Sequence, residues 1–96
     1  MNKVINKIYT QLNLKLVSNK NDISKIEYLD LDTKCLYRFL ENNSVYRITD
    51  QKTQYSIHRN NKNKVKRFLS TEDAMICSIP TILSYKQKIH TENYWI

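Results

Sequence analysis

The chain has 96 residues, of which 16 are lysine or arginine and 9 are aspartate or glutamate, so its net charge is +7 and its pI is near 9.5. This length predicts one domain over residues 1–96, near the lower end of the size at which a single core is stable without disulfides or metals. No stretch resembles a secretory signal or is apolar for long enough to span a bilayer, and no glycine is present to form a glycine-rich phosphate loop. The composition therefore argues against a membrane-spanning protein and against the usual nucleotide-binding enzymes.

Two cysteines, Cys35 and Cys77, lie far apart in the sequence. Reduced thiols in the cytoplasm are the expected state, and a structural disulfide is the minority interpretation. These cysteines and the two histidines, His58 and His90, have no partner at the spacing of a metal site or a catalytic triad. We therefore expect no metal, no cofactor and no catalytic activity. A small enzyme would require a cysteine close to a histidine after folding.

Residues 2–12 predict an amphipathic helix with one apolar stripe, made of Val4, Ile5, Ile8, Tyr9 and Leu12. Leu14 to Val17 follow as a short strand or extended segment, and residues 18–22 have the polar composition of a loop. Residues 23–31 could form a helix capped by Asp22. We prefer a strand there, because the pattern of the next segments extends onto it.

Four tyrosines stand nine residues apart in the middle of the chain: Tyr28, Tyr37, Tyr46 and Tyr55. The segments between them alternate apolar with polar residues or end in turn-forming pairs, which is typical of consecutive antiparallel strands. The strands after the first tyrosine are expected over Lys34–Leu40, Ser44–Asp50 and Thr53–His58. A further strand is expected around Lys64–Phe68, after a loop that contains Asn60 and Asn61.

Two-residue hairpin loops would fix the register of these strands. The pairs suited to such loops are Asp32-Thr33, Asn42-Asn43 and Gln51-Lys52. They predict one apolar face made of Ile26, Tyr28, Tyr37, Phe39, Tyr46, Ile48, Tyr55 and Ile57. The opposite, half-wet face would carry Glu27, Arg38, Arg47, Thr49, Gln54, Ser56 and His58, with Leu29, Leu36, Leu40 and Val45 among them. Arg38 would then lie directly opposite Arg47.

The segment FLSTEDAM, residues 68–75, predicts the start of a second helix, with Ser70 or Thr71 as the N-cap and acidic residues in the first turn. The apolar positions that follow at helical spacing are Met75, Ile76, Ile79, Ile82 and Leu83. Pro80 predicts a kink or a division near Ile79, and the final residues 94–96 are expected to dock back on the body. The fold class is thus α+β: an N-terminal helix and a kinked C-terminal helix packed on one face of a four- to five-stranded antiparallel meander.

The predicted Arg38 and Arg47 pair points to a binding surface, because like charges side by side cost stability unless an anionic group lies near. Glu27 is the intramolecular candidate for that group, and a carboxylate on a partner protein is the functional one. The expected partner-binding residues are Arg38, Arg47, Leu36, Tyr94 and Trp95. An unpaired sheet edge permits a homodimer as well as a monomer.

Nucleic-acid binding is the alternative function, because the run HRNNKNKVKR is strongly basic. The candidate phosphate-binding residues are Arg59, Lys62, Lys64, Lys66 and Arg67. The competing interpretation is a solvated basic edge. Part of the net charge also reflects composition, since asparagine, lysine, isoleucine and tyrosine are abundant and have AT-rich codons.

The order of elements resembles the small immunity proteins of bacterial polymorphic toxin systems. The similarity rests on YRFLENNSVYRI (residues 37–48) as a strand pair and on FLSTEDAMICSI (residues 68–79) as the start of a helix. It implies a non-catalytic protein that binds and blocks a cognate toxin in the cytoplasm of the producing cell. It transfers no active-site residue, and a phage-encoded inhibitor of a host defence complex belongs to the same physical class.

Overall fold

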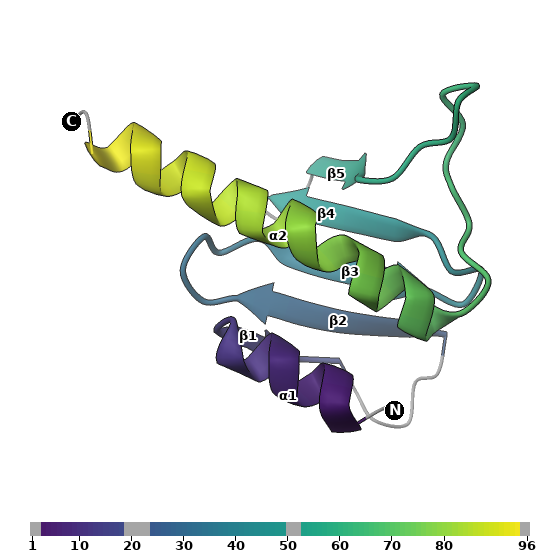
Figure 1. Cartoon of the computed structure of the whole chain (residues 1–96), viewed down its shortest axis with the longest axis horizontal. Coiled ribbons are helices and arrows are strands. Elements are labelled where there is room, and N and C mark those ends of the chain that lie inside the picture. Colours follow the sequence, from purple (N-terminus) through teal and green to yellow (C-terminus); the bar gives the residue numbers. More distant parts are fainter. Residues whose placement is uncertain (1–2, 19–23, 50–52, 95–96) are drawn as a thin grey trace.

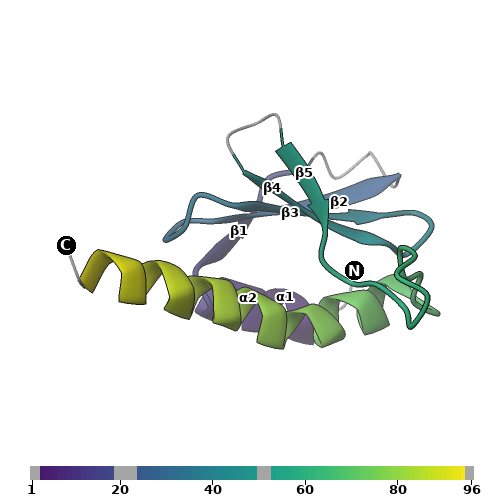
Figure 2. The same cartoon turned by 90° about the horizontal axis from the view of Figure 1, so that it is seen from above.

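The computed structural model describes residues 3–18, 24–49 and 53–94, with the side chains of the final helix described as far as Lys88. The elements in chain order are α1 (Lys3–Gln11), β1 (Leu14–Leu16), β2 (Lys25–Asp30), β3 (Leu36–Leu40), β4 (Val45–Thr49), β5 (Thr53–Ser56) and α2 (Thr71–Tyr94). The strands form one antiparallel sheet in the order β1-β2-β3-β4-β5. Both helices lie on the same face of the sheet, and none of the described elements covers the other face (Figure 1, Figure 2). The predicted α+β class is confirmed.

The five strands include Leu14–Leu16, which pairs with β2 as an edge strand. The strand predicted around Lys64–Phe68 does not form. That part of the chain makes only an isolated bridge, between Arg59 and Val65. The prediction of a strand there is therefore wrong, and the segment between β5 and α2 projects from the sheet instead (Figure 1).

A cluster of aromatic rings joins the two helices to the middle of the sheet. Tyr9 of α1 is fully buried, and its ring centre lies 4.8 Å from that of Tyr28 and 6.1 Å from that of Phe39. Burial raises the pKa of Tyr9, so its hydroxyl keeps its proton and donates a 2.6 Å hydrogen bond to the carbonyl oxygen of Met75 in α2. Rings of this size supply a large part of the apolar stabilisation of a small core. Val4, predicted to share the buried stripe of α1, is exposed instead.

The register between β2 and β3 is as predicted, with Tyr28 paired to Tyr37. The loop is longer than the predicted two residues and comprises residues 31–34, because the N–H of Asp30 donates to the Cys35 oxygen at 2.8 Å. The last pair before the loop is therefore Asp30 with Cys35, and not Leu31 with Lys34 as a two-residue loop requires. The pairs further along the two strands are unchanged. A loop two residues longer therefore leaves the faces of both strands as expected.

The turn between β3 and β4 is one residue longer than predicted. The N–H of Leu40 donates to the Ser44 oxygen at 3.0 Å and that of Asn43 to the Leu40 oxygen at 2.9 Å, which leaves residues 41–43 as a three-residue loop. Asn43 has a φ of 64°, the left-handed conformation that closes such a loop and that asparagine tolerates well. The Asn42 side chain accepts hydrogen bonds from the N–H and the hydroxyl of Ser44. The prediction of a two-residue loop is therefore wrong.

This longer turn shifts the register by one residue and reverses β4. Phe39 pairs with Val45, and Tyr37 pairs with Arg47. Val45 is fully buried under the helices, whereas Tyr46 lies half-buried on the uncovered face. Successive residues of a strand point to opposite faces. The predicted faces are therefore wrong for the whole strand: Val45, Tyr46, Arg47, Ile48 and Thr49.

A second three-residue connection follows, because Thr49 pairs with Thr53. Its residues 50–52, which include the predicted turn, lie outside the described residues. This second shift by one residue compensates for the first, so Tyr55 pairs with Arg47 and lies on the helix-covered side, as predicted. Tyr55 is nevertheless 49% exposed, because β5 is an edge strand. The two later tyrosines of the nine-residue series are therefore not core residues.

Helix α2 begins where the sequence predicts it. The Ser70 hydroxyl oxygen accepts a 3.1 Å hydrogen bond from the N–H of Asp73, which makes Ser70 the N-cap. The predicted division near Ile79 does not occur, since α2 continues unbroken through the exposed Pro80. Its buried side carries Ala74, Met75, Ser78 and Ile82, whereas Ile76 and Leu83 of the predicted stripe are exposed.

An ion pair fixes α2 to the turn between β2 and β3. Asp30 is fully buried, and its Oδ1 accepts hydrogen bonds from the N–H groups of Asp32 and Thr33. The Lys86 ammonium lies 2.8 Å from Asp30 Oδ1 and 2.9 Å from Asp32 Oδ2. Its side chain is 17% exposed. One lysine thus neutralises a buried carboxylate on a segment remote in the sequence.

Candidate functional site

We refer to the side of the sheet that faces away from the two helices as the open face (Figure 2). It carries Lys15, Lys25, Glu27, Leu29, Leu36, Arg38, Leu40, Tyr46, Ile48, Gln54 and Ser56. Leu29, Leu36 and Ile48 are consecutive register partners on β2, β3 and β4. They form an apolar row across the middle of the open face, with Lys15 on the β1 side and Gln54 on the β5 side.

A charged row lies beside the apolar row. Arg38 Nε donates to Glu27 Oε2 at 2.8 Å, and Arg38 Nη1 donates to Gln54 Oε1 at 3.1 Å. Lys25 Nζ lies 4.0 Å from the other Glu27 oxygen. Glu27 is the one acidic residue among the open-face residues defined above, so Lys15, Lys25 and Arg38 leave this surface with excess positive charge.

The five residues predicted to bind a partner do not form one surface. Leu36 and Arg38 lie on the open face, as predicted. Arg47 lies on the opposite side, because the three-residue turn reverses β4. Tyr94 ends α2, whose last turns project past the sheet instead of folding back on the body (Figure 1, Figure 2). Trp95 lies outside the described residues.

Arg47 lies between two tyrosine rings on the helix-covered side. Its Cζ atom is 3.8 Å from the ring centre of Tyr85 on α2 and 5.3 Å from that of Tyr55 on β5. We refer to Arg47, Tyr55 and Tyr85 as the arginine bracket. Tyr85 was not singled out by the sequence patterns. It stands three positions after the buried Ile82, and that helical spacing is the signal that could have identified it.

Three buried polar atoms of the described side chains have no hydrogen-bond partner, and they lie on neighbouring strands of the helix-covered side. They are Oδ2 of Asp30 on β2, the hydroxyl of Tyr37 on β3 and Nε of Arg47 on β4. Burial, followed by the nearby Cys35 and Asp30, raises the pKa of Tyr37, although Arg47 acts in the opposite direction. Tyr37 therefore keeps its proton and can donate a hydrogen bond.

Residues 58–67 form a projection between β5 and α2, which we refer to as the basic finger (Figure 1). Asn60 holds its tip. The N–H of Asn60 donates to the Lys64 oxygen at 2.9 Å, and its side-chain Oδ1 accepts from the N–H groups of Lys62 and Lys64. Asn63 takes the left-handed conformation, with a φ of 62°. In a chain without glycine, asparagine supplies the backbone conformations of this tight turn.

All five cations predicted to bind phosphates are exposed: Arg59, Lys62, Lys64, Lys66 and Arg67. The sequence between Gln51 and Thr71 has six lysines and arginines and no acidic residue, so this segment accounts for +6 of the net charge of +7. Leu69, close to the finger, is 96% exposed. The finger is therefore the main concentration of positive charge along the chain.

His58, predicted on the open face, instead anchors the finger to α2. Its Nε2 lies 2.9 Å from the Ser78 hydroxyl, and its ring is edge-on to that of Phe68. The single hydroxyl proton of Ser78 is donated to the Ala74 oxygen, so His58 Nε2 carries a proton and donates to Ser78. Burial, and then the charge of Lys66, lowers the pKa of His58. This geometry is an anchor and not an activated serine, because the histidine is the donor.

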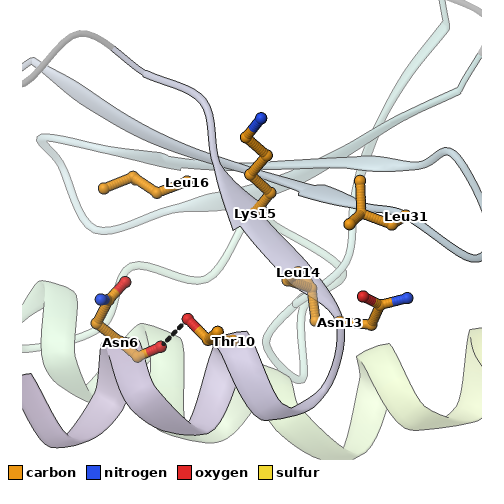
Figure 3. A pocket seen from close by; sticks show the side chains of 7 residues that line it. All are labelled: Asn6, Thr10, Asn13, Leu14, Lys15, Leu16 and Leu31. Carbon is orange, nitrogen blue, oxygen red and sulfur yellow. Dashed lines mark hydrogen bonds between the residues drawn. The ribbon is translucent and has the colours of Figure 1, made fainter.

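A groove of about 510 Å³ lies beside α1 and the edge strand β1 (Figure 3). It is lined by Asn6, Thr10, Asn13, Leu14, Lys15, Leu16 and Leu31. The Thr10 hydroxyl donates to the main-chain oxygen of Asn6, whose side-chain oxygen accepts from the Tyr28 hydroxyl. The Asn13 amide donates to Asp32. The Thr10 hydroxyl, the Asn6 oxygens and the Asn13 amide thus already have partners within the protein, and of the lining residues only Lys15 adds a charged group.

The described residues bring no cysteine into hydrogen-bond contact with His58, and the His90 side chain lies outside the description. Within the same part of the chain, no three side chains of His, Cys, Asp or Glu gather to hold a metal ion. Cys35 is buried, Cys77 is exposed and both are free thiols. None of the described helices has the length and apolar character needed to cross a bilayer.

The open face, the arginine bracket and the basic finger are thus the three surfaces with unused binding capacity in the described part of the chain. The open face and the arginine bracket both include residues of β4 and β5, but on opposite sides of the sheet, and the basic finger follows β5. Comparisons of the chain with protein-family models, with curated proteins and with solved structures found no match.

Proposed function

We propose that this protein is a small non-catalytic inhibitor of the immunity type, which binds and blocks a partner protein through its open face. The main support is the apolar row on a sheet face that neither helix covers, in which Leu29 and Leu36 are partly exposed and Ile48, 8% exposed, lies between its neighbours. The resemblance to immunity proteins of polymorphic toxin systems supports the same class. The partner is then a toxin or, for a phage-encoded inhibitor, a component of a host defence complex.

The open face combines the features of a binding surface. Its central row is aliphatic, as in the apolar core of many interfaces. Tyr46 and Arg38, paired in the neighbouring row, are of the residue types that most often dominate the binding free energy. Arg38 is held by Glu27 and Gln54, so its side chain loses little rotamer freedom when a partner docks. The ion pair also gives the surface a defined donor pattern beside the apolar row.

Charge indicates which partner fits. Lys15, Lys25 and Arg38 outnumber Glu27 on this surface, so it is complementary to an apolar patch with an acidic rim. A second copy of the chain is a poor occupant, because two molecules of charge +7 would bring like charges together. We therefore propose a different, acidic protein as the partner.

We place this inhibitor in the cytoplasm. Cys35 and Cys77 are both free thiols, which is the usual state of cysteines in a reducing compartment. The resemblance to immunity proteins also implies a protein that protects the cell in which it is made. Both considerations agree on the same compartment.

Replacing Leu36 by glutamate should weaken binding of the partner about tenfold or more, because it places a carboxylate in the apolar row against an acidic partner. The variant should fold, since Leu36 is only partly buried and points away from the core. The immobilised protein first captures its partner from a lysate of the source cells. The purified partner is then titrated against wild type and variant by calorimetry, and its own activity is measured with and without the protein.

The matched control is Leu83→Glu on the exposed side of α2, which should bind the partner like the wild type. Equal losses for Leu36→Glu and Leu83→Glu, or no loss for either, would refute the open face as the binding site. A partner that keeps its full activity in the saturated complex would refute inhibition.

Nucleic-acid binding is a second candidate function, and the basic finger favours it. Its cations are exposed on a turn whose tip is fixed by the hydrogen bonds of Asn60, and no acidic residue stands between Gln51 and Thr71. Each lysine or arginine placed against a phosphate releases counterions. Residues 58–67 contain no phenylalanine, tyrosine or tryptophan to stack on a base. Binding by the finger would therefore depend on the charge of the phosphates and not on the base sequence of the nucleic acid.

Log affinity falls as log salt concentration rises, and each contact with a phosphate makes this fall steeper. The double change Lys62→Gln and Lys64→Gln should reduce the magnitude of the slope by about 2, if both side chains contact phosphates. Fluorescence anisotropy with a labelled DNA duplex over a range of salt concentrations measures this slope. The control is Lys7→Gln with Lys88→Gln, two exposed lysines outside the finger, which should leave the slope unchanged. An affinity that does not vary with salt would exclude this function.

A further inference from the structure

The guanidinium of Arg47 has no carboxylate partner among the described residues. The acidic side chains of the described ion pairs, Glu27, Asp30 and Asp32, are bound by Lys25, Arg38 and Lys86. Arg47 Nε is buried without a partner, and Nη1 reaches only the sulfur of Cys35 at 3.9 Å, a weak acceptor. A cation taken partly out of water without an anion costs free energy. The rings of Tyr55 and Tyr85 offset part of that cost, and the unpaired Nε–H leaves the rest in place.

The groups around Arg47 suit an anion. Tyr37 and Tyr55 are its register partners on the two neighbouring strands, and the ring of Tyr85 covers it from α2 at 3.8 Å. Stacking on an aromatic ring holds a guanidinium in a fixed plane and leaves the N–H groups at its edge able to donate. The Tyr37 hydroxyl is buried, protonated and without a partner, so it is a further donor on the same side of the sheet.

We infer that Arg47, Tyr37 and the rings of Tyr55 and Tyr85 form a binding site for one oxyanion, a carboxylate or a phosphate. A guanidinium presents parallel N–H groups that match two oxygens of either anion. Arg47 is partly exposed and Tyr55 is half-exposed on the edge strand β5, so an anion can approach from that edge. The site lies on the helix-covered side, opposite the open face, and does not depend on the proposed inhibitor function.

The test is a titration of the ¹⁵N-labelled protein with sodium phosphate and, separately, with sodium acetate, at an ionic strength held constant with sodium chloride. The buried Nε–H of Arg47 is observed directly in arginine-selective ¹H–¹⁵N spectra of the wild type. We expect its cross-peak to shift and to saturate. The Nε–H of Arg38, already bonded to Glu27 at 2.8 Å, is the internal reference and should not saturate. An Arg47 cross-peak that stays in place, or follows Arg38 without saturating, would overturn the site.

Two variants test the same site independently. Arg47→Lys should weaken anion affinity about tenfold or more, because an ammonium cannot bind two oxygens in parallel. Tyr85→Leu should weaken it in the same direction by removing the stacked ring. The backbone amides of Tyr37 and Tyr55 report binding in these variants, and Lys7→Gln, which removes an exposed cation outside all three surfaces, is the control that should bind like the wild type. Unchanged saturable binding in Arg47→Lys would also overturn the site.

The same titration separates the two classes of ligand. Saturation by acetate and by an acetylated glutamate amide would identify a carboxylate, such as an acidic side chain, as the group bound. Saturation by phosphate alone would identify a phosphate. Either result supports an oxyanion site at Arg47. If neither acetate nor phosphate gives a saturable shift, the site is excluded.

Discussion

Replacing Val45 by aspartate should unfold the protein, whereas the same change at the neighbouring Tyr46 should leave it folded. Val45 is fully buried in the core cluster, where a carboxylate would have no partner. The cost is on the order of several kcal/mol, which approaches the total stability of about 5–15 kcal/mol typical of a domain. Tyr46 lies half-buried on the open face, where aspartate stays hydrated, so we expect a loss of about 1–2 kcal/mol.

Urea unfolding followed by far-ultraviolet circular dichroism measures both variants. The comparison is a direct test of the register between β3 and β4, because the two residues are adjacent and point to opposite faces. A two-residue turn at Asn42-Asn43 predicts the reverse order, with Tyr46→Asp unfolded and Val45→Asp folded. That outcome would contradict the pairing of Phe39 with Val45.

Replacing Lys86 by methionine should destabilise the protein by about 3–5 kcal/mol, because it leaves the buried carboxylate of Asp30 without its cation. The hydrophobic stem of the lysine is largely preserved in methionine, so the loss reports the charge. The free energy of unfolding in urea is the measurement. Lys88→Met, at an exposed position of the same helix, is the control and should change the stability by less than about 0.5 kcal/mol.

A double variant distinguishes the ion pair from simple packing. Lys86→Met combined with Asp30→Asn removes both charges, and it should be more stable than Lys86→Met alone because no unpaired carboxylate remains. If the double variant instead lost as much unfolding free energy as the two single variants added together, with both single losses large, each side chain would act through separate contacts.

The ion pairs of Lys86 with Asp30 and Asp32 should stabilise the fold only within a defined pH range. Burial alone would lower the pKa of Lys86, but its hydrogen bonds to Asp30 and Asp32 outweigh this and raise it. The contribution of Lys86 to the free energy of unfolding is complete below pH 10.5, and it is lost as the pH rises through the raised pKa. Hydrogen bonds from Lys86 and then from Asn13 lower the pKa of Asp32, so its contribution is present above 3.8 and is lost as the pH falls through the lowered value. Lys86→Met should flatten the stability profile at both ends.

Much of the fold could be predicted from local patterns. The register of β2 and β3 follows from apolar alternation, since Tyr28 and Tyr37 each need a buried position and their pairing provides it. The start of α2 follows from capping chemistry at Ser70. Of the candidate site, Leu36 and Arg38 were predictable in the same way, because they stand on β3, whose register with β2 was predicted correctly.

The position of Arg47 could not be predicted, because the local sequence is compatible with two turns. Asparagine at residues 42 and 43 suits a two-residue loop and equally a three-residue loop with Asn43 in the left-handed conformation. Contacts from remote residues favour the second. The N–H of Phe68 donates to the Asn43 oxygen, and the Thr71 hydroxyl, 28 positions away in the sequence, donates to the Asn43 side chain, each at 3.1 Å.

The sequence by itself determined the two helices and the meander up to β5, because hydrophobic period, capping residues and turn-forming asparagines act over a few neighbouring positions. It did not determine the end of the sheet, since the strand expected around Lys64–Phe68 does not form. Only the tertiary structure decided which side of the sheet β4 presents, and with it the separation of Arg47 from Arg38. The physical reason is that one extra residue in a turn costs little locally, yet it reverses every side chain of the strand that follows. Contacts between segments distant in the sequence settle such a choice.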